Sequence, residues 1–261
     1  MHHASESLFG ETLHTRISIK FLTLLSYIIP KKIIYCSKIS REIHHKFGYC
    51  REKSLIINNS VDTSIFRPSK IFRKETRKKL GIQENEILIG LIARNDPNKG
   101  IGMFIEIIKN LLKEDNLYKF VICGENMEYK YLKNSFNFNY EEYSEKIILL
   151  GEIAYPQKVL NGIDILVCPS ITESFGLIAL EGICCGTPVI ATNLIPFKEI
   201  LNKNFIVNSY TAESFISKIK LLSQKAQPKI RWTTHKESQK ISDVFSTVSM
   251  IKKFNFLYKN F

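Results

Sequence analysis

From Glu86 onward, short apolar runs alternate with amphipathic stretches along the chain. The apolar runs are rich in Ile and Val and have no polar face, which is typical of strands buried on both sides of a sheet. These expected strands cover residues 86–93, 118–124, 146–151, 164–169, 187–192 and 205–208. The expected helices between them cover residues 100–113, 125–137, 157–162 and 176–185. The alternation predicts an α/β domain built on a Rossmann-like, doubly wound parallel sheet.

A shorter version of the same pattern precedes this domain. It predicts a helix, a strand, a second helix and a second strand, over residues 15–29, 32–37, 39–47 and 54–58. Two strands are too few for an independent sheet. Either this segment packs against the larger domain, or a piece of protein is missing upstream of Met1.

Polar stretches divide the chain into three expected parts. The loop 59–68 and a basic helix over 71–80 form a natural linker, so we predict a partial N-terminal domain over 1–69 and a complete C-terminal domain over 70–227. Residues 228–261 are expected to form a helical segment that packs back toward the N-terminal part. Its apolar residues recur at three- and four-residue steps, which predicts one long helix with a single apolar stripe. They are Ile241, Val244, Phe245, Val248, Ile251, Phe254 and Leu257.

The positive charge of the chain is concentrated near its start. The 261 residues include 37 Lys and Arg against 25 Asp and Glu, a net charge of +12, and residues 1–80 alone hold 16 against 6. Such a block favours an anionic partner, which is a phospholipid surface, a phosphorylated substrate or nucleic acid, although a solvated Lys-rich face explains it equally well. Nucleic acid is not predicted, because no RNP-like aromatic strand or helix-turn-helix signal accompanies the charge.

The six cysteines and the N-terminal residues indicate a cytoplasmic protein. No CxxC pair and no Cys/His spacing for zinc is present, so the thiols are expected to be reduced. Residues 1–12 lack the apolar stretch of a secretory signal. The longest apolar run, 17–29, contains Lys20 and is too short to span a bilayer. It predicts a core helix or a membrane-surface helix, and the second reading makes the protein peripheral on the inner face of the membrane.

One constellation of residues suggests an anion site. A Ser/Thr-rich turn follows the strand that ends at Pro169, and Phe175-Gly176-Leu177 then begins a helix. The free N–H groups at a helix start can hold a phosphate. Glu173 before the helix and Glu181 within it flank this position. Because carboxylates repel phosphate, we expect them to accept hydrogen bonds from sugar and ribose hydroxyls. The alternative is an ordinary helix start with Glu181 exposed.

Two cations are expected at the same sheet edge. Arg94 follows the strand 86–93, and Lys99 lies in the loop after it. Ligands gather at the carboxyl ends of parallel strands, so both side chains should point into the crevice used by the Glu173 loop. A guanidinium and an ammonium together form a diphosphate clamp. No Asp-x-Asp pair occurs, so we expect no metal.

In combination these motifs resemble a known family. The segments ARNDPNKG (93–100), ESFGLIALE (173–181, an E-x7-E element) and CGTPVIAT (185–192) look like the nucleotide-sugar domain of retaining glycosyltransferases of family 4, which have the GT-B fold. The segments HHAS (2–5), IIYCS (33–37) and INNSVDTSIFRP (57–68) look like the second half of that family's acceptor domain, whose first part is absent.

The resemblance implies a role for each matching residue. Arg94, Lys99 and the Phe175-Gly176-Leu177 segment, through its backbone amides, would bind the donor diphosphate. Glu173 would hold the transferred sugar and Glu181 the ribose, with His3 near the reacting centre. Recognition of uracil or guanine would depend on the backbone near the strand ends at Gly124 and Gly151. No cofactor is implied beyond a UDP- or GDP-type donor substrate.

The implied function is retaining transfer of a sugar from a nucleotide diphosphate-sugar to a glycan or lipid-linked acceptor, in cell-surface polysaccharide or glycolipid biosynthesis. The alternative is a non-catalytic remnant or partner subunit that keeps a nucleotide-sugar pocket. In that case a separate chain would supply the missing N-terminal half. One departure from the family pattern lies at 194–199, where Leu-Ile-Pro-Phe-Lys-Glu replaces a segment that commonly contains a Gly pair, so we expect a differently shaped loop.

Overall fold

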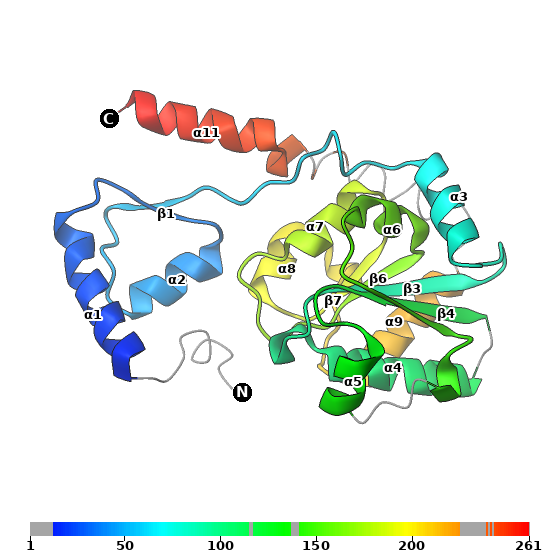
Figure 1. Ribbon diagram of the computed structural model, residues 1–261. Coiled ribbons are helices and arrows are strands. Elements are labelled where there is room, and N and C mark those ends of the chain that lie inside the picture. Colours follow the sequence, from blue (N-terminus) through cyan, green and yellow to red (C-terminus); the bar gives the residue numbers. More distant parts are fainter. Residues whose placement is uncertain are drawn as a thin grey trace.

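A computed structural model of the protein describes residues 13–114, 117–136, 141–224, 239, 241 and 243–260. Its main feature is a five-stranded parallel sheet with the strand order β5-β4-β3-β6-β7 (Figure 1). The strands are β3 (Ile87–Ile92), β4 (Tyr118–Cys123), β5 (Ile147–Gly151), β6 (Ile165–Cys168) and β7 (Val189–Ala191). The order starts in the middle and moves outward in both directions, so the predicted doubly wound parallel sheet is confirmed.

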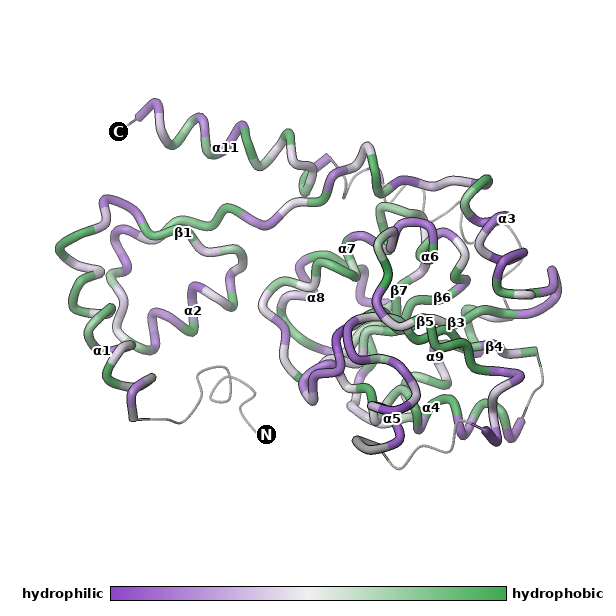
Figure 2. Tube along the Cα trace, viewed as in Figure 1, coloured by the Kyte–Doolittle hydropathy of each residue, from purple (hydrophilic) through white to green (hydrophobic). Residues whose placement is uncertain are grey.

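Helices cover both faces of this sheet. Helices α4 (Ile101–Glu114) and α9 (Ala212–Gln224) lie on one face, while α6 (Pro156–Gly162) and α7 (Leu177–Cys184) lie on the other (Figure 1). Successive strand residues point to opposite faces, so the apolar strands feed two separate cores. In β3, for example, Leu88 packs on the α7 side and Ile89 on the α4 side. Figure 2 shows the hydrophobic colouring concentrated on these strands.

The sheet ends one strand earlier than the sequence predicts. Residues 203–205 form a short 3-10 helix, and Ile206 makes only an isolated bridge to Ala191. The predicted strand 205–208 is therefore wrong, because the chain touches the sheet edge at one residue and then leaves it. The segment expected as a loop at 194–199 instead forms helix α8 (Ile195–Ile200), with Pro196 in its first turn. Proline is well suited to that position.

The N-terminal part contains the four predicted elements: α1 (Leu13–Ile28), β1 (Ile33–Tyr35), α2 (Lys38–Lys46) and β2 (Ser54–Ile56). Strands β1 and β2 form a two-stranded parallel sheet of their own. Helix α2 packs against α8 of the larger domain. A crossing segment, residues 57–69, then leads from β2 back to the large domain (Figure 1).

The C-terminal residues return to this crossing segment. The N–H of Val61 donates to the carbonyl of Phe245 at 2.9 Å, and the N–H of Thr247 donates to the carbonyl of Val61 at 3.2 Å. Ser246 has extended backbone there and caps the last helix, α11 (Thr247–Lys259). The prediction of one long helix over this segment is therefore wrong, because the extended backbone at Ser246 interrupts it. Phe245 is buried, whereas Val248 is 62% exposed.

The basic helix α3 (Lys70–Lys79) is fastened to the large domain. Arg73 and Arg77 each donate to a different oxygen of Asp164, at 2.5 and 2.6 Å. Arg77 also donates to the carbonyls of Gln83 and Glu86. Its side chain is only 9% exposed. Two of the linker cations thus serve the packing of α3 and do not face an external anion.

Candidate active site

Three loops meet at the carboxyl edge of the sheet. The N–H of Ile171 donates to the carbonyl of Asn98 at 2.8 Å, which joins the loop after β6 to the loop after β3. The N–H of Asn95 donates to the carbonyl of Glu125 at 2.9 Å, which joins the loop after β3 to the loop after β4. A Cβ added at Gly100 would lie 1.8 Å from the carbonyl oxygen of Pro169. Glycine is therefore required for the loops to approach this closely.

The structure brings Lys99 and Glu173 together in this edge. The ammonium of Lys99 lies 2.9 Å from Oε2 of Glu173, with side-chain exposures of 25% and 12%. The second oxygen of Glu173 accepts the N–H of Ser174 at 3.1 Å. Lys99 ends a single 3-10 turn that the side chain of Asp96 caps at the N–H of Asn98. The carboxylate of Glu173 thus has one partner at each oxygen, the ammonium of Lys99 and the N–H of Ser174.

Arg94 lies at the same edge but in a more open position. Its side chain is 68% exposed and approaches Asp96 at 3.8 Å, a distance typical of a weak surface ion pair. Of the two predicted cations, Lys99 is therefore the one that the fold orients toward Glu173.

Close packing shapes the backbone at the helix start at Gly176. Gly176 has a φ of +92°, and an added Cβ would lie 2.8 Å from the ring of Phe197, so both the backbone and the packing require glycine. Helix α7 begins at Leu177, and its N-cap residue Gly176 has no side chain that could bond the first amides of the helix. The ring of Phe175 is buried against Phe245, with ring centres 5.8 Å apart. Phe175 can therefore meet a donor only through its backbone.

Glu181 lies on α7 in an apolar environment. Burial raises the pKa of its carboxyl group from the usual 4.5 to about 7. Among the described residues, no group hydrogen-bonds this carboxyl group. Such a carboxyl group is available to a ligand. When it is ionised, it can accept a hydrogen bond from a ligand hydroxyl.

The raised pKa of Glu181 makes a testable prediction about stability. Between pH 4.5 and 7 the folded protein holds a proton that the unfolded chain has released, so stability falls as pH rises through this window. Glu181→Gln should remove this decline and raise the melting temperature at pH 8 but not at pH 4.5. Thermal unfolding at several pH values measures the effect. Glu106→Gln, at an exposed position of α4, is the control, and equal pH profiles for the two variants would contradict the prediction.

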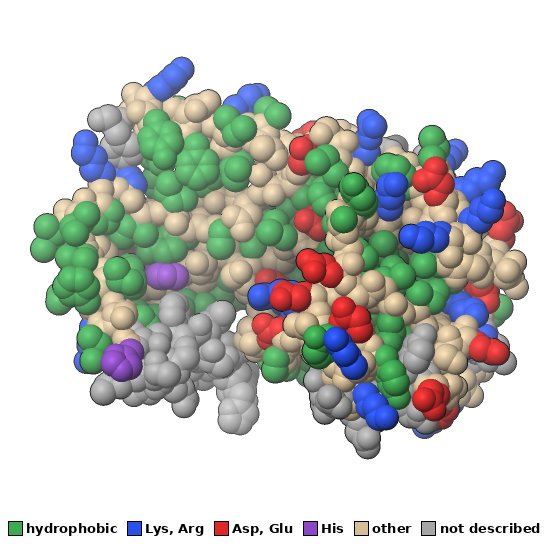
Figure 3. All heavy atoms as spheres, in the orientation of Figure 1, with side chains coloured by type: hydrophobic (Ala, Val, Ile, Leu, Met, Phe, Trp, Pro, Cys, Tyr) green, Lys and Arg blue, Asp and Glu red, His purple; other side chains and the backbone are tan. Residues whose placement is uncertain are grey.

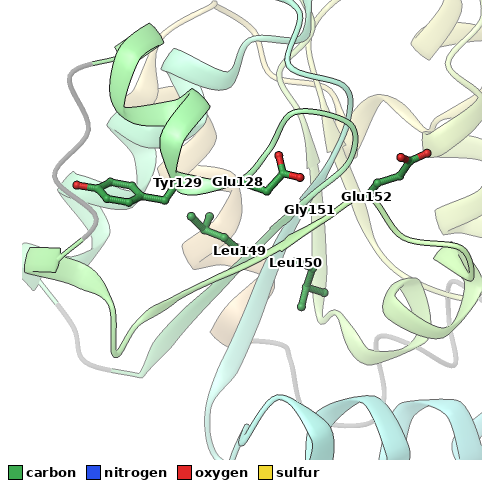
Figure 4. A pocket seen from close by; sticks show the side chains of 6 residues that line it. All are labelled: Glu128, Tyr129, Leu149, Leu150, Gly151 and Glu152. Carbon is green, nitrogen blue, oxygen red and sulfur yellow. The ribbon is translucent and has the colours of Figure 1, made fainter.

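A cavity of about 500 Å³ opens beside the end of β5. Figure 4 shows the side chains that line it, which are Glu128, Tyr129, Leu149, Leu150 and Glu152, with Gly151 between them. The N–H of Gly124 donates to the carbonyl of Gly151 at 2.7 Å, so the cavity adjoins both strand ends singled out for base recognition. Sequence reasoning missed Glu128 and Tyr129. Their position just after the loop that follows β4 was the available signal, because such loops gather at one edge.

The sequence also led to predictions about His3, metal binding, the cysteines and membrane spans. His3 lies outside the described residues. Within the described ranges, no group of three or more His, Cys, Asp or Glu side chains is placed to hold a metal ion. None of the six cysteines forms a disulfide with another, and five of them are buried. No helix in the described part of the chain combines the length and apolar character needed to cross a bilayer.

Together, the five-stranded parallel sheet with helices on both faces and the small two-stranded parallel sheet agree with the GT-B fold. Residues 72–239 match the family described as glycosyl transferases group 1. The match covers more than half of the chain, and the protein belongs to this family.

Curated relatives extend the similarity upstream of this match. The O-antigen biosynthesis glycosyltransferase WclY of Escherichia coli is 24% identical over 229 residues, which cover 88% of this chain and 61% of that protein. The UDP-Gal:alpha-D-GlcNAc-diphosphoundecaprenol alpha-1,3-galactosyltransferase of Escherichia coli is 27% identical over 253 residues, covering 92% and 62%. The chain thus spans about three fifths of the length of these relatives.

Solved structures share the fold. Anabaena HepE in complex with UDP superposes with a TM-score of 0.82 at 18% identity, covering 94% of this chain and 68% of that one. Sucrose-phosphate synthase from Thermosynechococcus elongatus gives a TM-score of 0.80 at 17% identity, covering 98% and 63%. The matched regions include both the large domain and most of the N-terminal part, which supports the GT-B organisation predicted from the sequence.

Proposed function

We propose that the chain acts in a retaining glycosyltransferase that moves a sugar from a nucleoside diphosphate-sugar to a glycan or lipid-linked acceptor. The observation that carries this proposal is the Lys99–Glu173 pair beside the uncapped start of α7. An ammonium group, the first amides of a helix and a carboxylate that can accept hydrogen bonds from hydroxyls lie there at one edge of the sheet. The similarity to the O-antigen biosynthesis glycosyltransferase WclY and to the diphosphoundecaprenol galactosyltransferase supports a role in cell-surface polysaccharide or glycolipid synthesis.

The proposed mechanism relies on charge stabilisation. Negative charge grows on the diphosphate as the bond to the sugar breaks. Lys99, Arg94 and the amides at Gly176 and Leu177 interact with this growing charge, so they stabilise the transition state more strongly than the ground state. The ammonium of Lys99 has three protons, so it can keep Glu173 while it binds a phosphate oxygen. Glu173 holds sugar hydroxyls, and the leaving phosphate takes the proton of the acceptor.

The nucleoside is placed by the remaining groups. Glu181 accepts hydrogen bonds from the ribose hydroxyls, and the nucleobase occupies the cavity beside Gly151 (Figure 4). HepE has been solved with UDP and with UDP-glucose, which supports a uridine donor for this chain. His3 is proposed near the reacting centre on the resemblance alone.

Calorimetric titration with UDP and GDP tests the proposal. We expect binding of one of the two in the micromolar to millimolar range and no change on adding excess chelator, because cationic side chains and helix amides do the work of a metal. Lys220→Ala, at a surface ion pair on α9, is the control and should bind normally. Failure to bind either nucleotide would overturn the proposed function. A strict requirement for Mn²⁺ or Mg²⁺ would overturn its metal-free mechanism.

A cytoplasmic, peripheral association with anionic membrane is proposed for the same protein, because lipid-linked acceptors lie there. Helix α1 carries the exposed apolar residues Ile17, Phe21, Leu24 and Ile28, at steps that place them on one face. Figure 3 shows hydrophobic side chains gathered at this end of the molecule. The stripe is long enough for surface binding.

Vesicle sedimentation tests the membrane proposal. Wild-type protein should bind vesicles containing anionic lipid at low salt and be released as salt rises, because screening weakens surface charges. Phe21→Lys with Leu24→Lys should abolish the apolar contribution. The triple change of Lys74, Lys78 and Lys79 to Gln separates the exposed linker cations from Arg73 and Arg77, which hold Asp164. Equal sedimentation with neutral and anionic vesicles would contradict the proposal.

A second candidate function is a partner subunit that binds nucleotide-sugar and relies on another polypeptide for the rest of its acceptor domain. The two-stranded β1–β2 sheet and the exposed α1 stripe favour it, because a complete α/β half would cover both. Nucleotide binding without sugar transfer by this chain, restored to transfer by an added acceptor-side polypeptide, would support this candidate.

A further inference from the structure

Ser37 joins the N-terminal part to the loop that carries Glu173. It follows β1, is fully buried, and its hydroxyl donates to the carbonyl of Ser174 at 2.6 Å. The two residues are 137 positions apart in the chain. This contact joins the N-terminal segment to the loop after β6, next to the proposed sugar-binding residue Glu173.

Ser174, whose carbonyl Ser37 holds, also orients the carboxylate of Glu173. The N–H of Ser174 donates to Oε1 of Glu173, and the carbonyl of Ser174 accepts the hydroxyl of Ser37. The two groups lie in adjacent peptide units that share the Cα of Ser174, so a shift of the carbonyl is passed on to the N–H that fixes Glu173. Two residues further along, Gly176 is the N-cap of α7, the helix whose first amides bind the diphosphate in the proposed function.

The remainder of this loop is held by other distant segments. Phe175 packs edge to face on Phe245, which is bonded through its carbonyl to Val61 of the crossing segment. Gly176 lies against Phe197 of α8. The loop therefore contacts the C-terminal segment, helix α8 and the N-terminal part. Ser37 supplies the contact from the N-terminal part, a side-chain hydrogen bond.

We propose that Ser37 is a positioning residue, which fixes Glu173 and the first turn of α7 and so ties the geometry of the donor crevice to the position of the acceptor-side segment. This inference rests on the proposed function. Ser37 touches no reacting atom in this scheme, because it acts through the backbone of Ser174.

Ser37 also caps helix α2, and the test must separate the two roles. Its hydroxyl oxygen accepts the N–H of Ser40 at 3.1 Å. Glycine is nearly as good as serine at a helix N-cap, so Ser37→Gly keeps most of the cap while it removes the bond to Ser174. Ser69→Gly is the matched control, because Ser69 caps α3 in the same way at Phe72, remote from the crevice.

Nucleotide affinity and hydrogen exchange provide two independent readouts. Ser37→Gly should weaken binding of the preferred nucleotide, UDP or GDP, by about three- to tenfold, as expected for one lost hydrogen bond. It should also speed amide exchange in residues 173–178 by a similar factor and leave β4 unchanged. Ser37→Thr, which retains the hydroxyl, should restore both values, and Ser69→Gly should match wild type in both.

The outcomes separate this inference from the proposed function. If Ser37→Gly binds nucleotide as tightly as Ser69→Gly, with equal exchange in residues 173–178, Ser37 only caps α2 and the inference is wrong. If wild type binds neither nucleotide, the proposed function fails, and the exchange of residues 173–178 still decides whether Ser37 positions the loop. Faster exchange throughout the protein in Ser37→Gly would show a general loss of stability and would also overturn the inference.

Discussion

Asp164→Ala is expected to destabilise the protein by about 3–5 kcal/mol, the usual consequence of removing one partner of a buried ion pair. The carboxylate of Asp164 accepts hydrogen bonds from Arg73, from Arg77 and from the N–H of Leu88 at the start of β3. The side chain of Arg77 is 9% exposed, so it cannot regain full hydration once Asp164 is gone. The variant therefore leaves a charge and a strand amide without their partner.

Urea unfolding measures this loss. Glu114→Ala breaks the exposed pair with Lys220 and is the control, with an expected effect below about 1 kcal/mol. The double variant Asp164→Leu with Arg77→Leu should lose less than the sum of the single variants, because the two charges disappear together. A loss from Asp164→Ala no larger than that of the control would show that α3 is not fastened through this carboxylate.

Lys99→Ala is expected to have the largest effect on ligand binding. It removes a charged hydrogen bond to the diphosphate, which contributes about 1.5–3 kcal/mol, and so weakens UDP or GDP affinity by roughly ten- to 150-fold. It also leaves Glu173, with a side chain only 12% exposed, without its ammonium partner. The uncompensated carboxylate should repel the incoming diphosphate and add to the loss.

Calorimetric titration compares this variant with two others. Arg94→Ala should weaken binding less, because the side chain of Arg94 is 68% exposed and hydration screens its charge. Lys99→Ala with Glu173→Gln should recover part of the lost affinity, since the repelling charge is neutralised. Unchanged affinity in Lys99→Ala would exclude this lysine from the diphosphate clamp, and a larger loss in Arg94→Ala would reverse the order of the two cations.

The sequence alone was sufficient for the alternation of elements. The apolar runs at β3, β4 and β6 predict buried strands because their Ile and Val content leaves no polar face. The sequence placed Glu173 just before a helix and Glu181 within it, because their spacing and the Phe-Gly-Leu segment between them are local features. The strand predicted at 205–208 failed because a short apolar run does not reveal whether a sheet edge is available to it.

Periodicity and motif spacing are properties of neighbouring residues, so the sequence by itself determined the fold class, the family resemblance and the candidate residues of the crevice. Long-range contacts decided the rest. Only the tertiary structure pairs Lys99 with Glu173 while leaving Arg94 on the surface, and commits Arg77 to Asp164. Only the tertiary structure brings Ser37 to Ser174 across 137 positions. The physical reason is that a charged or hydroxyl group carries no local signal of its partner, which is chosen by the packing of elements that are distant in the chain.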